Sequence, residues 1–275
     1  MKPLPVPFFN SKLETRDVLP MRAIILAAGV GKRFKEVTDH RPKCLIDIQG
    51  KTLLERTLTA LGAAGIREAV VVIGYRGEMI QQRIGSRCGD VHVRYVTNPH
   101  YTKGAILSLW SAREEFNDDI IIMDADVLFP VALIARLVDS PHANCFLLDG
   151  GSENTGEEQM LLTRGGRVLN IVRGGSGDFD VVGESVGFLK VARTDAPLLR
   201  SILDDFVAQG RDTIEHEEAF PVFLAQRVVG FERVDDLPWI EIDFPTDLEQ
   251  AERDVLPRIL ALDFSGARSR LGQWH

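Results

Sequence analysis

Short apolar runs alternate with amphipathic segments along the first half of the chain, and this alternation limits the fold more than any other feature. Residues 22–28 (RAIILAA) and 69–73 (AVVVI) are apolar runs with the length of buried strands. Between them, residues 53–64 have the spacing of an amphipathic helix that ends at Gly65. The same alternation continues to residues 120–123 and predicts an α/β fold, with a Rossmann-like, mixed but mainly parallel sheet and helices on both faces.

The spacing of apolar residues and the frequency of glycine divide the 275 residues into regions. In residues 1–20 the apolar residues follow neither a helical nor a strand spacing, and this segment is predicted to be an N-terminal extension. The core is predicted to occupy residues 21–262, and residues 263–275 form a tail. Within the core, glycines become frequent after residue 150, which indicates hairpins and loops, so residues 150–240 are expected to form a small β-rich insertion that binds a substrate.

Further elements are predicted from the same patterns. Helices are expected near residues 77–84, 105–115, 197–208 and 217–225, with a last one from Asp247. Strands are expected near residues 92–96, 228–233 and 239–242.

Composition excludes several classes of protein. The net charge of -8 and the pI near 5.3 argue against a nucleic-acid binder, which needs concentrated Lys and Arg. No run of eighteen apolar residues is present, so no membrane partner is expected. Residues 1–20 also lack the pattern of a signal peptide, and the three cysteines are scattered outside any metal-ligand spacing. These features predict a cytoplasmic protein.

A glycine loop follows the first apolar run, in the sequence LAAGVGKR at residues 26–33, and RPKCL follows at residues 41–45. Glycines let the backbone approach phosphate groups, and free amides at a helix start bind anions. Phe34 stands where a dehydrogenase loop needs a third glycine, and Arg33 stands where a Walker loop needs Ser or Thr. The expected phosphate-binding set is Leu26, Ala27, Ala28, Gly29, Gly31, Arg33 and Lys43.

Together with two later acidic positions, this loop resembles the nucleotidyltransferases that join nucleoside monophosphates to sugar phosphates and small phospho-compounds, through their L-A-A-G-x-G-x-R…P-K pattern. The resemblance implies the fold of nucleotide-diphospho-sugar transferases. It implies Asp126 and Asp243 as ligands of a Mg²⁺ cofactor, since hard oxygen ligands suit Mg²⁺. It also implies that Lys43 bridges the α-phosphate and the acceptor, while Arg33 holds the β- and γ-phosphates.

Within that family, the chain is most similar to the choline-phosphate, 2-aminoethylphosphonate and inositol-phosphate cytidylyltransferases. This similarity is carried by residues 98–101 (NPHY), 108–110 (SLW) and 184–188 (ESVGF). It implies nucleotide contacts from Asn98, Gly104 and Asp124. The implied reaction transfers CMP from CTP to a small phosphorylated or phosphonate acceptor, of the phosphocholine or 2-aminoethylphosphonate type, and releases pyrophosphate. The acceptor is already ionised at neutral pH, so it needs no general base.

Carboxylates and an aromatic ring in the second half suit an acceptor that carries a positive charge. The expected acceptor-binding residues are Glu184, Glu217, Trp239 and Glu241. His216 fits a plain helix start as well as a functional role.

Two alternatives stay open at this point. One is a sugar-1-phosphate or inositol-1-phosphate nucleotidyltransferase that uses another nucleoside triphosphate. The other is a catalytically silent nucleotide-sensing subunit, although Lys43, Asp126 and Asp243 are all present together. The sequence leaves acceptor identity and oligomeric state open, and a homodimer is compatible with it.

Overall fold

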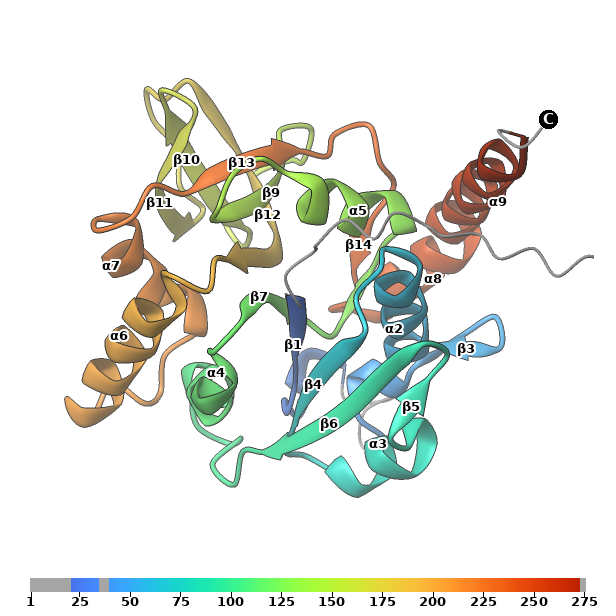
Figure 1. Ribbon diagram of the computed structural model, residues 1–275, viewed down its shortest axis with the longest axis horizontal. Helices are drawn as coiled ribbons and strands as arrows, with labels where there is room; N and C mark the ends of the chain where they lie inside the picture. Colours follow the sequence, from blue (N-terminus) through green and yellow to red (C-terminus); the bar gives the residue numbers. More distant parts are fainter. Residues whose placement is uncertain (1–20, 35–39, 273–275) are drawn as a thin grey trace, which may run out of the picture.

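The computed structural model describes residues 21–34 and 40–272, so the predicted extension of residues 1–20 lies outside the described residues (Figure 1). A ten-stranded sheet forms the core of the molecule. Eight of its strands lie side by side in the order β11 (Arg167–Arg173), β10 (Gln159–Arg164), β12 (Val181–Val191), β7 (Asp119–Asp124), β1 (Met21–Ala27), β4 (Glu68–Ile73), β6 (Val91–Thr97) and β5 (Arg87–Cys88).

Strand direction divides this sheet into two parts. β1, β4, β6 and β7 run parallel to one another. β12 pairs antiparallel with β7, and β10 and β11 continue from β12 as an antiparallel hairpin. β9 (Cys145–Asp149) also pairs with β12, and β13 (Gly230–Arg233) runs parallel to β9. The predicted mixed, mainly parallel sheet is therefore confirmed for the central strands, whose carboxyl ends meet at one edge.

Helices cover both faces of the sheet. Side chains of β1 alternate between the two faces, so each face presents apolar residues that helices bury. Ile25 belongs to a buried cluster on one face, and Ile24 belongs to a second cluster on the other. The first cluster includes side chains of α2 (Leu53–Ala63), α3 (Gly77–Ile84) and α5 (Val131–Asp139), and the second those of α4 (Ile106–Ser111), α6 (Ala196–Ala208) and α7 (Phe220–Leu224). The predicted fold class is thus confirmed.

A third buried cluster brings the glycine-loop region together with the end of the chain. Phe34 and Leu53 pack in it with Ile242 and Leu256. The segments that it joins or borders are η1 (Lys32–Phe34), η2 (Lys43–Leu45), β2 (Asp47–Ile48), β3 (Lys51–Thr52), β8 (Val127–Leu128), β14 (Ile240–Glu241), α8 (Pro245–Gln250), the π-helical η5 (Ala251–Val255) and α9 (Leu256–Gly272). Arg33 and Asp243, which are 210 residues apart, are held near each other by this packing.

Helix bounds depart from the sequence prediction in four places. The helix expected at 105–115 ends at Ser111 and continues as the short turn η3 (Arg113–Glu115). The helix expected at 217–225 is split into η4 (His216–Ala219) and α7, since Pro221 fits only the first turn of a helix. α5 was not predicted, and α9 runs past residue 262. No helix of the described residues is long and apolar enough to cross a membrane.

Candidate active site

A cavity of about 910 Å³ opens where the carboxyl ends of β1 and β7 face β12 and β14. It joins the parallel half of the sheet to the antiparallel half. Twelve of the residues predicted for the site line it: Leu26, Ala28, Gly29, Gly31, Arg33, Lys43, Asp124, Asp126, Glu184, Glu217, Glu241 and Asp243. The structure therefore gathers residues that are more than 200 positions apart in the sequence around one space.

The glycine loop forms one wall of the cavity directly after β1. Gly31 has a φ of +68°, a left-handed conformation that is costly for other residues, and its carbonyl accepts a hydrogen bond from the amide of Phe34. A side chain at Gly29 would find no atom within 4 Å, so open space lies beside its backbone. The loop can therefore admit a bulky anion such as a phosphate close to the main chain.

Lys43 lies between two carboxylates at the centre of the site. Its Nζ atom is 2.8 Å from Oδ2 of Asp126 and 2.5 Å from Oδ1 of Asp243. Buried Cys44 and Leu45 anchor η2, and the Lys43 side chain is only 13% exposed. Burial alone would lower the pKa of Lys43, but the two carboxylates outweigh it and raise this pKa, so the ammonium stays charged.

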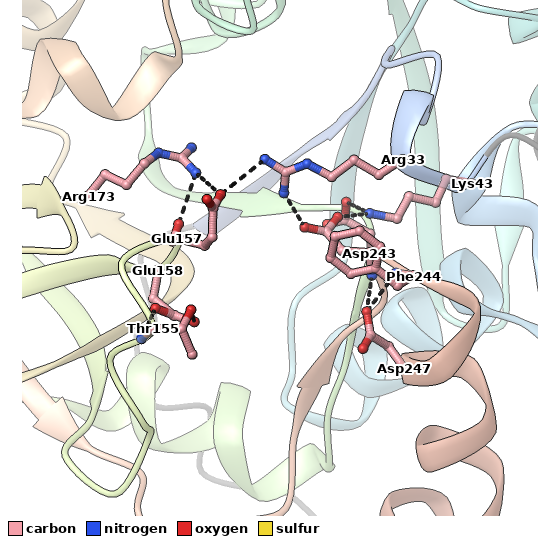
Figure 2. A network of polar contacts seen from close by, with 10 residues as sticks. Arg33, Lys43, Thr155, Glu157, Glu158, Arg173, Asp243, Phe244 and Asp247 are labelled. Atoms are coloured by element: carbon pink, nitrogen blue, oxygen red, sulfur yellow. Dashed lines mark hydrogen bonds and ion pairs between the residues drawn. The ribbon is translucent and has the colours of Figure 1, made fainter.

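Arg33 extends from the same side of the cavity as Lys43 and points toward Glu157 (Figure 2). Its NH1 atom donates to Oδ2 of Asp243 at 2.7 Å, and its NH2 atom lies 3.8 Å from Oε2 of Glu157. Arg173 on β11 holds the same glutamate, at 3.3 Å. Because Glu157 is 73% exposed, these contacts are weak, and an arriving anion can replace its carboxylate.

Asp243 is fixed by its own loop as well as by these cations. The amides of Asp243 and Phe244 both donate to Oδ2 of Asp247, at 2.8 and 2.6 Å. Burial opposes ionisation of Asp243, yet Lys43 and Arg33 prevail and lower its pKa. The carboxylate is thus held charged and in place.

Three carboxylates converge closely enough to hold a metal ion. Ligand oxygens of Asp126, Glu241 and Asp243 lie within 4.8 Å of one another. Oδ1 of Asp126 is buried and has no hydrogen-bond partner, which leaves one strong ligand atom unused. Burial, then the charges of Asp126 and Asp243, raise the pKa of Glu241 to about 8. This donor set of hard oxygens fits a cation such as Mg²⁺.

A second cluster in the same cavity contains Asp124, His216 and Glu217. His216 Nε2 is 3.9 Å from Asp124 Oδ1, and His216 Nδ1 is 3.1 Å from Glu217 Oε2. Burial and the neighbouring charges of Glu217 and Asp126 raise the pKa of Asp124 well above its usual range. His216 is 4% exposed, and sequence reasoning left it out of the site because a histidine at a helix start carries no distinctive signal.

Four predicted residues do not line this cavity: Ala27, Asn98, Gly104 and Trp239. Trp239 packs against the first core cluster, and its Nε1 atom donates to Asp149 at 2.8 Å, so it links β14 to β9. Buried Asn98 donates to Ser108 and accepts from the amide of His100. A side chain at Gly104 would lie within 2.5 Å of the backbone of Ile214 and its neighbour, which explains the glycine by packing.

Other residues line the cavity without having been predicted as site residues. Tyr101, Ser108 and Ser185 belong to the segments that carry the subgroup similarity. The following gave no clear signal in the sequence: Lys103, Glu157, Arg173, Phe244 and Asp247. Glu184 on β12 was predicted and lines the cavity, and burial raises its pKa.

Comparisons with known proteins bear on the family and the fold of the chain. Residues 23–166 match the MobA-like NTP transferase domain. The CMP-5'-(3-aminopropyl)phosphonate synthase of Streptomyces rubellomurinus is 35% identical over 136 residues, which are 49% of this chain and 22% of that protein. The choline-phosphate cytidylyltransferase of Haemophilus influenzae is 34% identical over 151 residues, 55% of this chain and 62% of that protein. The chain therefore spans less than two thirds of either relative.

A solved structure shows the same fold. The CTP:phosphocholine cytidylyltransferase of Streptococcus pneumoniae superposes with a TM-score of 0.70 at 22% identity, over 85% of this chain and 98% of that one. At this identity the similarity concerns the fold alone.

Proposed function

Since the chain belongs to the family of MobA-like NTP transferase domains, we propose that it transfers CMP from CTP to a small phosphorylated or phosphonate acceptor and releases pyrophosphate. One observation carries this proposal: Lys43 meets Asp126 and Asp243 in a cavity that also contains the glycine loop. A phosphate-binding loop, a buried cation and paired carboxylates are the parts that nucleotidyl transfer needs.

The choice of CTP and of the acceptor draws on the relatives. One is named for CMP-(3-aminopropyl)phosphonate synthesis and another as a choline-phosphate cytidylyltransferase. Both names combine a cytidine nucleotide with a small nitrogen-containing phospho- or phosphono-compound. Acidic residues Glu184, Glu217 and Glu241 line the cavity, and they favour an acceptor with a positive charge.

In the proposed reaction, an acceptor oxygen attacks the α-phosphorus in line with the departing pyrophosphate. The acceptor is ionised at neutral pH, so catalysis consists of positioning and of neutralising crowded negative charge. Lys43 neutralises charge where the α-phosphate and the acceptor meet. Arg33 binds the β- and γ-phosphates in place of Glu157, and the backbone of Leu26, Ala28, Gly29 and Gly31 lines the phosphate path.

Asp126 and Asp243 would hold Mg²⁺, as the unpartnered Oδ1 atom of Asp126 supports. When bound, the ion would supply a hard Lewis acid that neutralises negative charge on the phosphates. Lys43 must then turn from the two carboxylates toward phosphate. Asn98 and Gly104 would act on the nucleotide only indirectly, by supporting the cavity wall.

The cytoplasmic location of the protein stays a prediction.

The test is pyrophosphate release by the full chain with Mg²⁺, each of four nucleoside triphosphates and an acceptor panel. The panel contains 2-aminoethylphosphonate, 3-aminopropylphosphonate, phosphocholine, glucose-1-phosphate and inositol-1-phosphate. We expect CTP with one of the first three compounds to give the highest kcat/KM. A higher value for a sugar or inositol phosphate would support the first alternative. CTP binding without pyrophosphate release from any pair would support a nucleotide-sensing subunit.

A further inference from the structure

The cluster of Asp124, His216 and Glu217 has no task in the proposed phosphate chemistry. Asp124 ends β7, and the other two residues belong to η4, so two distant segments bring them together at the cavity wall. One ligand atom from each residue lies within 4.8 Å of the others. The cluster is separate from the group formed by Asp126, Glu241 and Asp243.

Two buried atoms of this cluster lack hydrogen-bond partners. They are Nδ1 of His216, whose residue is 4% exposed, and Oε2 of Glu217. The two atoms are 3.1 Å apart. Buried polar atoms are nearly always hydrogen-bonded, so these two atoms indicate that a bound molecule supplies a hydrogen-bond partner at this place.

We propose that Asp124, His216 and Glu217 bind the primary ammonium group of the acceptor, an inference that rests on the proposed function and narrows its substrate class. A primary ammonium has three N–H donors, and the cluster offers two carboxyl groups and an imidazole nitrogen as their partners. One ligand atom from each residue lies within 4.8 Å of the others, so charge-assisted hydrogen bonds from the three residues can converge on one nitrogen.

The same geometry disfavours a quaternary ammonium. Such a group has no N–H to donate and is bound by aromatic faces, whereas this cluster presents two carboxylates and an imidazole. Gly187 on β12 leaves room for the carboxylate of Asp124, since a Cβ atom at Gly187 would lie 2.4 Å from Oδ2 of Asp124. The favoured acceptor therefore carries an unmethylated amine.

The position of the cluster also limits the length of the acceptor. Asp124 stands two residues before Asp126, and an extended chain separates such Cα atoms by at most about 7 Å. An acceptor that reaches both residues can therefore be a short molecule. The class is a short-chain aminoalkyl phosphonate or phosphate.

The test compares matched acceptors on the full chain with CTP and Mg²⁺. In propylphosphonate a methyl group replaces the ammonium of 2-aminoethylphosphonate, and phosphocholine is the trimethylated form of phosphoethanolamine. We expect kcat/KM to favour 2-aminoethylphosphonate over propylphosphonate by about a hundredfold or more, because a site built around N–H donors rejects analogues without them. Phosphoethanolamine should exceed phosphocholine by about tenfold.

Glu217→Gln removes one carboxylate charge, and it should reduce the preference for 2-aminoethylphosphonate over propylphosphonate to below about tenfold. The matched control is Glu218→Gln, since Glu218 is exposed and does not line the cavity, and it should keep the full preference. Thermal unfolding reports whether each variant is folded. If Glu217→Gln fails to fold, the comparison of matched acceptors on the unchanged protein still tests the proposal.

Equal kcat/KM for each matched pair, a preference for phosphocholine, or an undiminished amine preference in folded Glu217→Gln would overturn the proposal. Stoichiometric Zn²⁺ binding that Glu217→Gln abolishes would also overturn it, because the cluster would then be a metal site. If no acceptor is turned over, the proposed function fails. Calorimetry then decides separately whether 2-aminoethylphosphonate binds more tightly than propylphosphonate.

Discussion

Replacing Lys43 with alanine removes the cation that two carboxylates share. Its Nζ atom lies 2.8 Å from Asp126 and 2.5 Å from Asp243, and 13% of its side chain is exposed. The loss of one preorganised donor to a developing charge lowers kcat by about a hundred- to a thousandfold. We expect at least a hundredfold loss for Lys43→Ala. Breaking a mostly buried ion pair also costs about 3–5 kcal/mol, so the variant should unfold at a lower temperature.

Pyrophosphate release gives kcat and KM for this variant, and calorimetry gives its unfolding temperature. Saturating Mg²⁺ should recover part of the lost stability, because the ion replaces the ammonium between the carboxylates, but it should not recover kcat. Lys51→Ala is the control, since Lys51 is exposed on β3. A kcat for Lys43→Ala within about threefold of the unchanged protein would refute the assigned role. Full recovery of kcat by Mg²⁺ would show that Lys43 serves only to balance charge.

Three further outcomes are expected. Asp126→Asn and Asp243→Asn should each raise the Mg²⁺ concentration needed for half-maximal rate by about tenfold or more; unchanged titrations in both variants would make the pair structural. Trp239→Phe should lower the unfolding temperature by the loss of its indole donor, yet leave the acceptor KM within about twofold, since its ring does not line the cavity. A thiol reagent at pH 8 should label Cys88 before Cys44, because burial raises the pKa of the Cys44 thiol to about 12; faster labelling of Cys44 in the folded protein would contradict this burial.

The parts of the site that follow a central strand could be predicted from the sequence. The glycine loop comes directly after β1, and Asp126 comes just after β7, so local patterns fixed their place at the edge of the sheet. Asp243 follows the two-residue strand β14, and its place in the site was implied by the family resemblance. The position of a residue at the end of a central strand can be predicted once the order of the strands and helices is known.

Other parts depend on packing that no local pattern reveals. Trp239 was expected at the acceptor because it is near Asp243, but it lies just before β14, and its indole donates to Asp149 at the end of β9. Arg173 and His216 reach the cavity only because β11 and η4 fold back over it. Their sequence neighbourhoods are those of an ordinary exposed strand and helix start, and α5 was likewise hidden in a nearly continuous apolar run.

Pairing of β12 with β7 has a mechanical consequence for how substrates enter. Main-chain hydrogen bonds join the two strands from Phe188 opposite Met123 to Val191 opposite Ile120. This seam connects the wall that carries the glycine loop to the wall that carries Glu184, so the two walls cannot swing apart like the jaws of a hinged enzyme without breaking the ladder. Any closure over the substrates must therefore come from the loops around the cavity and not from a hinge between β7 and β12.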